Sequence, residues 1–298
     1  MFARSVGRAS KPYDPSVSAL ASERSPEERR EALKEVLART RACVRCAELA
    51  NTRKSVVFGA GNADAELMFI GEAPGASEDE QGLPFVGRAG KLLQTLLAEI
   101  GLEREDVFIA NVLKCHPPHN RDPQPAEIEN CQEYLYGQVE LIQPAIICTL
   151  GNFATKLLRG DPAGITRVHG QPQVITLGRR AVRLYPIYHP AAALYTPRML
   201  ETLREDFARL PGLLELGAPE QIDMGEVPQT AAEDALGERD GLSPAPEHEP
   251  GERDGSNAVP AHESGERDGS GAATVATSGS KAPGGGDQSP KAGQLDLF

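Results

Sequence analysis

The sequence predicts an α/β fold, with three αβα layers around a central, mostly parallel sheet. Short apolar runs alternate with helical patterns along residues 25–216, which is typical of a parallel sheet covered by helices on both faces. A glycine-rich, acid-bearing segment, residues 71–90, lies directly between a strand and a helix, where α/β proteins bind ligands. The composition changes near Gly217, so the 298 residues indicate one domain followed by a long tail.

The elements are expected in the following order. Ser25 followed by Pro26 predicts the start of a helix, whose buried stripe contains Leu33, Val36 and Leu37. Apolar runs without helical periodicity predict strands, and stripes at helical spacing predict helices. We expect strands at residues 67–70, 107–110, 145–150 and 183–187, and further helices from residue 89 to 100 and at residues 125–142, 152–158 and 198–210.

The segment 71–90 has the composition of a rigid ligand-binding loop. Five glycines allow close approach to the main chain, and two prolines stiffen the segment. A surface loop with solvated charges is the alternative, but this composition at a strand-to-helix junction argues against it. The segment also carries an aromatic side chain that we expect to be exposed, Phe85, and the carboxylates Glu72, Glu78, Asp79 and Glu80.

Four of the five cysteines are candidates for a metal site. Cys43 and Cys46 form a C-x-x-C pair, and Cys115 and Cys131 lie 16 positions apart around a polar loop. Thiolates from two such segments suit either an iron-sulfur cluster or structural zinc, and the spacing does not choose between them. Four unrelated buried thiols are the alternative. Cys148 lies in an apolar strand and is expected to be a buried thiol.

The charge distribution separates the tail from the domain. From Gly217 to Phe298 there are 16 acidic and 5 basic residues, so the net charge of −12 belongs almost entirely to the tail. The domain is nearly neutral, which leaves nucleic acid open as a partner. No apolar run reaches the ~18 residues of a membrane span. We therefore expect a cytoplasmic protein without a membrane segment.

Both ends of the chain are expected to be disordered. Residues 1–24 and 217–293 have too few large apolar residues to offset the cost of ordering them. Residues 217–293 form an acidic linker in which the sequence Gly-Glu-Arg-Asp-Gly begins three times, at Gly237, Gly251 and Gly265. Three short polar copies do not make a solenoid, so we interpret them as duplicated linker.

Several motifs together resemble one known family. They are Gly71-Glu72-Ala73-Pro74-Gly75, Pro84-Phe85-Val86-Gly87 with Ala89-Gly90, Asn111 before Lys114-Cys115, and His189-Pro190. Over roughly residues 35 to 212 the chain resembles the family 4 uracil-DNA glycosylases. The resemblance implies a uracil-DNA glycosylase-like fold, and it implies that Cys43, Cys46, Cys115 and Cys131 hold a 4Fe-4S iron-sulfur cluster.

The family resemblance also implies roles for individual residues. Phe85 offers a ring on which an extruded uracil can stack. The Asn111 amide can accept from uracil N3–H and donate to O4, and cytosine reverses both polarities. His189 lies beside uracil O2 in the family's arrangement, and Glu78 aligns with a carboxylate that orients the attacking water. The catalytic residues are then Glu78 and His189, and the uracil-binding residues are Gly71, Glu72, Ala73, Gly75, Phe85, Asn111 and His189.

Two partners are expected, and the chain is expected to be a monomer. Uracil-containing DNA, single- or double-stranded, is contacted through phosphates by Lys114, Arg121 and Arg198. The last five residues, 294–298, resemble the bacterial sliding-clamp-binding motif, in which a Gln and a Leu-x-Leu-Phe-like element fill a hydrophobic groove. The binding residues are then Gln294, Leu295, Leu297 and Phe298, tethered by a flexible linker.

The main function expected is hydrolysis of the N-glycosidic bond of uracil in DNA, which leaves an abasic site. The alternative is a uracil-DNA binding protein of the same superfamily that binds or crosslinks without turnover. That branch has a basic, His-containing insertion after the strand of Asn111, whereas this chain continues Lys114-Cys115-His116-Pro117-Pro118. An iron-sulfur electron carrier is disfavoured because ferredoxin ligands are more compactly spaced.

Overall fold

The computed structural model describes residues 24–221. The predictions for the N-terminus 1–24, the linker 217–293 and the C-terminal peptide 294–298 therefore fall almost entirely outside the described residues.

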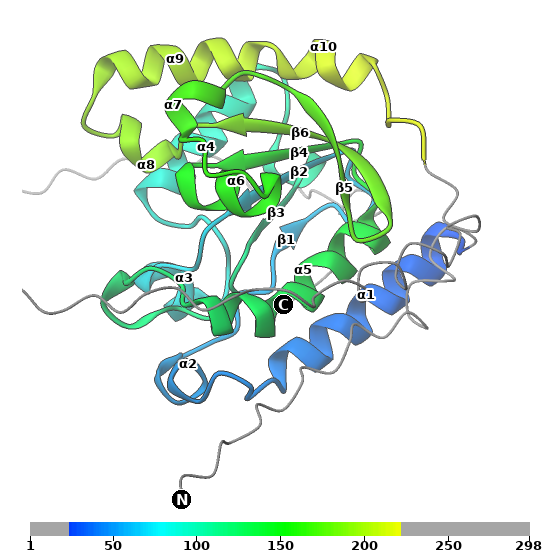
Figure 1. The fold of residues 1–298 in the computed structure, drawn as a ribbon, viewed down its shortest axis with the longest axis vertical. Helices are drawn as coiled ribbons and strands as arrows, with labels where there is room; N and C mark the ends of the chain where they lie inside the picture. Colours follow the sequence, from blue (N-terminus) through cyan, green and yellow to red (C-terminus); the bar gives the residue numbers. More distant parts are fainter. Residues whose placement is uncertain (1–23, 222–298) are drawn as a thin grey trace, which may run out of the picture. The chain divides into compact units, whose positions relative to one another are not determined.

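A single sheet forms the centre of the described part of the chain (Figure 1). Its strand order is β1-β3-β2-β4-β6-β5. The four inner strands are mutually parallel, whereas β1 and β5 pair antiparallel at the two edges. The strands are β1 (Ala60–Gly61), β2 (Leu67–Gly71), β3 (Phe108–Asn111), β4 (Ile146–Leu150), β5 (Gln173–Leu177) and β6 (Arg180–Ile187).

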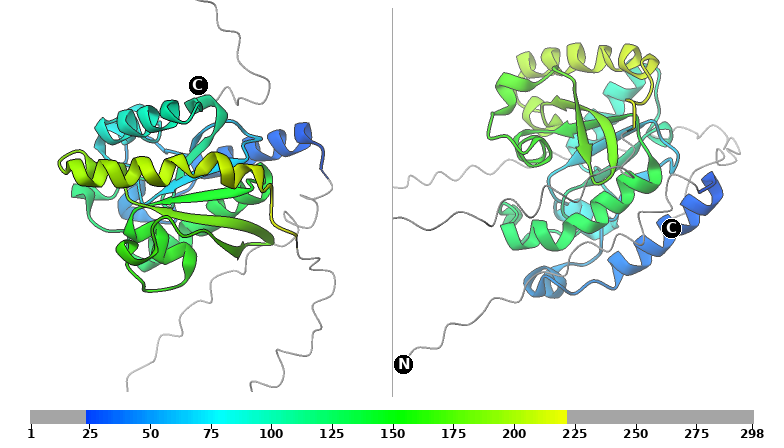
Figure 2. Two further views of the ribbon diagram at one scale, coloured as in Figure 1. Left: turned by 90° about the horizontal axis from the view of Figure 1, so that it is seen from above. Right: turned by 45° about the vertical axis from the view of Figure 1, so that its right-hand side comes forward.

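Helices cover both faces of this sheet, as Figures 1 and 2 show. On one face, α1 (Pro26–Arg41), α5 (Pro125–Ile142) and α6 (Asn152–Arg159) pack into one hydrophobic cluster. The opposite cluster contains α4 (Arg88–Glu99), α8 (Pro190–Ala193), α9 (Pro197–Ala208) and the first residue of α10 (Leu210–Glu215). The predicted three-layer αβα fold is confirmed. The shorter elements are α2 (Ala47–Thr52), α3 (Ala76–Gln81), α7 (Ile165–Val168) and the 3-10 turns η1 (Arg104–Asp106) and η2 (Pro118–Asn120).

The central strand β2 shows why the sequence folds this way. Met68 and Ile70 contribute to the cluster with α1, α5 and α6, which we call the α1–α5 cluster. Leu67 and Phe69 contribute to the opposite cluster, which we call the α4–α9 cluster. Since successive side chains of a strand point to opposite faces, a continuous apolar run buries both faces of the sheet.

Local signals set the starts of two long helices. Ser25 Oγ accepts from the Glu28 N–H, the Glu28 carboxylate accepts from the Ser25 N–H, and Pro26 occupies the first turn of α1. A second capping box, between Gln124 and Glu127, begins α5 at Pro125. These contacts satisfy backbone donors that a helix leaves unpaired. The predicted bounds of α5 are confirmed.

Some elements were not predicted. The segment between residue 71 and the helix predicted from residue 89 was expected to be a loop, but it contains helix α3. The acid-rich sequence of α3 is compatible with a helix, which is capped by Gly82 with φ +72°. The edge strands β1 and β5 were also missed, and β6 begins three residues before the predicted start. Within residues 24–221, no helix has the length and apolar character needed to cross a membrane.

Candidate active site

Four strand ends bring the candidate residues to one edge of the sheet. In the parallel register of β2 and β3, Gly71 is paired with Asn111, so the last residues of both strands lie side by side. Gly151 follows β4, and His189 comes two residues after β6. Because parallel strands end at the same edge, the loops after all four strands meet there.

The contacts around Gly71 define the floor of this region. A Cβ added at Gly71 would lie 2.4 Å from Asn111 Oδ1 and 2.9 Å from the Phe85 ring. Both distances are shorter than real Cβ contacts, so the position tolerates only glycine without rearrangement. Asn111 itself is 2% exposed. Gly71, Phe85 and Asn111 are thus packed together. We call these three residues, with Glu78 and His189, the strand-end cluster.

Phe85 was expected to be exposed, and that prediction is wrong, because its side chain is only 7% exposed. The ring packs against His189 with centroids 5.5 Å apart and planes inclined by 28°. The Phe85 backbone is left-handed, with φ 53°, a conformation rare for a bulky residue and costly by about 1–3 kcal/mol. Surrounding contacts must therefore hold it.

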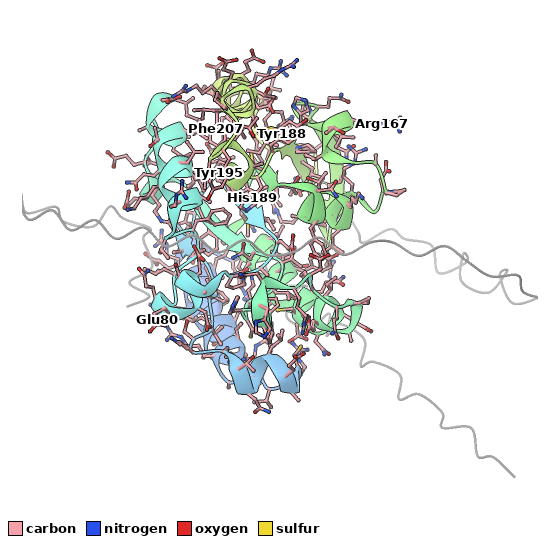
Figure 3. All side chains as sticks on the ribbon, turned by 90° about the vertical axis from the view of Figure 1, so that its left-hand side faces the viewer. Glu80, Arg167, Tyr188, His189, Tyr195 and Phe207 are labelled. Carbon is pink, nitrogen blue, oxygen red and sulfur yellow. The ribbon has the colours of Figure 1, made fainter. Side chains whose placement is uncertain are left out.

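The three adjacent carboxylates of α3 have different positions. Glu78 Oε1 accepts from the backbone N–H groups of Val86 and Gly87 at 3.1 and 3.2 Å, which orients the carboxylate beside Phe85. Asp79 accepts instead from the N–H groups at residues 54 and 55, and exposed Glu80 pairs with Lys54. Figure 3 shows Glu80 away from His189. Only Glu78 belongs to the strand-end cluster.

His189 is held as a neutral imidazole. It precedes α8, and its Nδ1 accepts from the Ala191 N–H at 3.1 Å, so the proton of the neutral ring is on Nε2. Burial lowers the pKa of His189 to about 4, although the nearby Glu78 acts in the opposite direction. A Cβ at Gly151, where φ is +88°, would lie 2.9 Å from His189 Cβ, so glycine permits this close packing.

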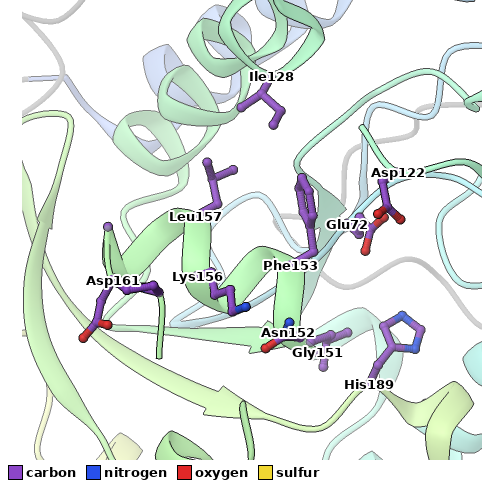
Figure 4. Close-up of a pocket in the computed structure, with 13 residues that line it drawn as sticks. Glu72, Asp122, Ile128, Gly151, Asn152, Phe153, Lys156, Leu157, Asp161 and His189 are labelled. Carbon is purple, nitrogen blue, oxygen red and sulfur yellow. The ribbon is translucent and has the colours of Figure 1, made fainter. Parts of the chain in front are cut away.

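A groove of about 630 Å³ begins at His189 and follows α6 (Figure 4). Glu72 and Asp122 lie at its His189 end, and Lys156 lies farther along. Burial, with a smaller effect of Asp122, raises the pKa of Glu72. Of the other residues predicted to bind uracil, Ala73 packs against the α1–α5 cluster, and a Cβ at Gly75 would lie 2.7 Å from Glu78 Oε2.

The four candidate cysteine ligands line one small cavity. Several donors are directed at their sulfur atoms: Arg53 Nη1 lies 3.1 Å from Cys115 Sγ, Asn130 Nδ2 lies 3.6 Å from Cys46 Sγ, and the Lys114 N–H lies 3.3 Å from Cys131 Sγ. Nevertheless, among residues 24–221 no three His, Cys, Asp or Glu side chains are arranged to hold a metal ion. Cys148 is fully buried in β4, as predicted.

The predicted DNA contact of Lys114 does not fit the structure. Lys114 is 1% exposed, and its ammonium donates to the Asn111 carbonyl at 2.8 Å and to Gln138 Oε1 at 2.6 Å. The Lys114 side chain therefore points into the core rather than to solvent. Arg121 is paired with Glu127 and Glu48.

The third predicted contact, Arg198, is exposed in the first turn of α9. Nearby, Tyr195 is 75% exposed and its hydroxyl accepts from Arg88 Nη1 at 2.9 Å. Figure 3 shows Tyr195 on the same side of the molecule as His189. This edge therefore retains exposed cationic groups.

One residue at the site was missed. Arg104 in η1 donates from Nη1 to the Phe85 carbonyl at 3.1 Å and from Nη2 to the Pro84 carbonyl. No local pattern in the sequence connects an arginine before β3 with a loop about twenty residues earlier, so only the folded chain reveals the contact.

Comparisons with known proteins agree with this geometry. The model of the Uracil DNA glycosylase superfamily matches residues 58–210. The Type-4 uracil-DNA glycosylase of Archaeoglobus fulgidus is 44% identical over 197 residues, which cover 65% of this chain and 98% of that protein. Those of Sulfurisphaera tokodaii and Saccharolobus solfataricus are 47% and 49% identical; both alignments cover 57% of this chain, and they cover 79% and 81% of the respective relatives.

The family match spans the strands β2 to β6 and the loops that carry the strand-end cluster. This chain belongs to the Uracil DNA glycosylase superfamily.

Proposed function

We propose that this protein is a uracil-DNA glycosylase, which accepts a uracil extruded from DNA and hydrolyses its N-glycosidic bond. The product is an abasic site, the starting point of base excision repair. The observation that carries the proposal is the strand-end cluster, in which a buried amide, an aromatic ring, a neutral imidazole and an oriented carboxylate meet. The names of the relatives support the same activity.

Asn111 is the group proposed to identify the base. Its amide accepts from uracil N3–H and donates to O4, and Phe85 supplies a ring for stacking. A cytosine presents the opposite donor and acceptor at these positions. Because the Asn111 side chain is buried, a mismatched base would leave polar groups unpaired at a cost of about 1–3 kcal/mol each.

His189 and Glu78 are the proposed catalytic residues. As the bond breaks, negative charge develops on the uracil, and the Nε2–H of His189 donates to its O2. Glu78 orients water toward the sugar, whose transition state carries positive charge. Glu72 contributes negative potential at the same edge.

The cysteine cavity is the proposed site of a 4Fe-4S cluster held by Cys43, Cys46, Cys115 and Cys131. Four thiols around one cavity with N–H donors directed at the sulfurs fit this group. A cluster bound by these four cysteines would crosslink the segment between α1 and α2 with the loop after β3 and with α5, which is a structural role.

The remaining partner proposals concern DNA and the tail. Arg198 and the partly exposed Arg121 are retained as phosphate contacts, whereas the buried Lys114 is not. The C-terminal peptide, residues 294–298, is proposed to bind the bacterial sliding clamp through a tether that raises its local concentration. The monomeric state and the cytoplasmic location stay predictions.

The first prediction tests base release. On an oligonucleotide with a single uracil, alkali treatment should reveal strand cleavage after wild-type incubation, and Asn111→Ala, His189→Ala and Glu78→Gln should each lower the single-turnover rate by about 10²–10³-fold. Glu80→Gln is the matched control, because Glu80 lies on the same helix but pairs with Lys54, and it should cleave at the wild-type rate. Wild-type protein that binds uracil-DNA and releases no base would contradict the proposal.

The second prediction concerns pH. Because burial lowers the pKa of His189 to about 4, the imidazole is neutral above that value and charged below it. The factor lost in His189→Ala should therefore stay constant between pH 5 and 8, the range in which an ordinary histidine titrates. Single-turnover rates of both proteins across this range test it. A factor that changes strongly near pH 6.5 would show that His189 acts as an ordinary titrating group.

The third prediction concerns the cysteines. Anaerobically purified protein should contain iron and acid-labile sulfide in equal amounts, with broad visible absorbance. Cys131→Ala should lose this absorbance and unfold at lower temperature. Cys148→Ala is the control, because it removes the thiol in β4, and it should retain the full iron content. Stoichiometric zinc without sulfide in the wild type would refute the cluster.

The fourth prediction concerns the tail. Wild-type protein should retain purified bacterial sliding clamp in a pull-down, and a double substitution Leu297→Ala and Phe298→Ala should abolish retention while leaving base release unchanged. Removal of residues 217–298 should have the same effect. Equal retention by the wild type and both variants would exclude the peptide as the binding element.

A further inference from the structure

The turn Pro84–Gly87 carries two parts of the proposed active site. Phe85 presents the stacking ring, and the N–H groups of Val86 and Gly87 hold Glu78 Oε1. The turn is also strained, because Phe85 has φ 53°. A strained backbone persists only where its surroundings over-determine it. Its restraints therefore bear directly on the geometry of the site.

Arg104 supplies a restraint on the carbonyl side of this turn. Its guanidinium donates to the carbonyls of Pro84 and Phe85, so one rigid planar group spans two successive peptide units. Arg104 lies in η1, directly before β3, the strand that ends in Asn111. The contact thus ties the turn to the strand that carries the proposed base-reading amide.

The start of α4 restrains the same peptide from another direction. A Cβ at Gly90 would lie 1.7 Å from the Phe85 carbonyl oxygen, so the first turn of the helix is pressed against it. The Phe85 carbonyl therefore lies between α4 and the Arg104 guanidinium. Bonds to the carbonyls also polarise the peptide groups, which strengthens the N–H donors of the following residues.

We propose that Arg104 is a positioning residue of the proposed glycosylase: by holding the carbonyls of Pro84 and Phe85, it fixes the orientation of both the Phe85 ring and the Glu78 carboxylate. Arg104 need not touch the substrate. The inference rests on the proposed function, since it assigns Arg104 a part in that reaction. Two side chains hold the turn through different backbone groups. Arg104 donates to the carbonyls of Pro84 and Phe85, and Glu78 accepts from the N–H groups of Val86 and Gly87.

A purely structural role makes a different prediction. If Arg104 only stabilised the fold, its loss would lower the melting temperature and the amount of active protein, but each folded molecule would react normally. If it positions the turn, folded molecules react slowly, because a displacement of about 1 Å costs on the order of 10²-fold in rate.

The experiment compares Arg104→Ala with Arg204→Ala, which removes an exposed arginine paired with Glu99. With enzyme in excess over a uracil oligonucleotide, Arg104→Ala should lower the single-turnover rate by about 10²-fold, and Arg204→Ala should not lower it. The dissociation constant for an oligonucleotide with a non-hydrolysable uridine analogue should stay near the wild-type value. Guanidinium added at millimolar concentration should partly restore the single-turnover rate of Arg104→Ala, whereas it would not relieve a folding defect.

A double-mutant cycle separates the two roles further. In a Glu78→Gln background, Arg104→Ala should cost much less than in the wild type, since both residues act on the same carboxylate geometry. Arg104→Lys keeps the charge but lacks the two-pronged donor and should give an intermediate rate; it replaces Arg104→Ala if that variant does not fold. Wild-type rates in Arg104→Lys, or multiplicative losses in the cycle, would overturn the inference. Wild-type protein that releases no uracil would instead refute the proposed function.

Discussion

The position of β2 between two parallel neighbours is the constraint on which the site depends. β3 lies on one side of β2 and β4 on the other. After β2 the chain therefore continues to one side of the sheet, and after β3 it crosses to the other side. The loops after β2 and its neighbours therefore diverge and leave room for a ligand at this edge. The pairing of Gly71 with Asn111 is part of the same register. A slip of one residue would move the apolar side chains of β2 to the wrong faces, so burial of the core also fixes the site.

The buried polar residue Lys114 connects this edge to the cysteine cavity. Its ammonium holds the main-chain carbonyl of Asn111, while its backbone N–H is directed at Cys131 Sγ. Gln138 completes the arrangement by accepting from Lys114 and donating to the Phe58 carbonyl. Burial lowers the pKa of Lys114 to about 8, although Cys131 and Cys115 act in the opposite direction. Lys114 therefore links the cysteine cavity to the main chain of Asn111, the residue proposed to read the base.

The sequence was informative where function depends on local pattern. Strand ends, helix caps and motifs placed Gly71, Asn111 and His189 at one edge, and the register β2–β3 agrees with that placement. It was misleading where exposure depends on tertiary packing: Phe85 looked like a lone aromatic in a polar loop, yet α4, His189 and Arg104 enclose it. The prediction that Lys114 contacts DNA was wrong for the same reason. A charged side chain suggests exposure to solvent, and its buried partner Gln138 lies 24 residues away in the sequence. Helix α3 was missed because glycines and prolines on both sides indicate a loop, whereas its six residues have few helix breakers.

In the proposed reaction, the charges at this edge of the sheet would favour the transition state over the ground state. Glu78 and Glu72 lie near a histidine that is neutral, although DNA brings further negative charge. In the ground state these carboxylates have no cation in the substrate to stabilise. As the glycosidic bond breaks, the sugar becomes positive and the base negative; in the proposed arrangement the carboxylates would then stabilise the sugar and the imidazole N–H the base. Interactions that strengthen only at this stage lower the barrier without tightening the binding of substrate. Burial keeps His189 neutral although Glu78 favours the charged form, so the imidazole carries no charge before the reaction.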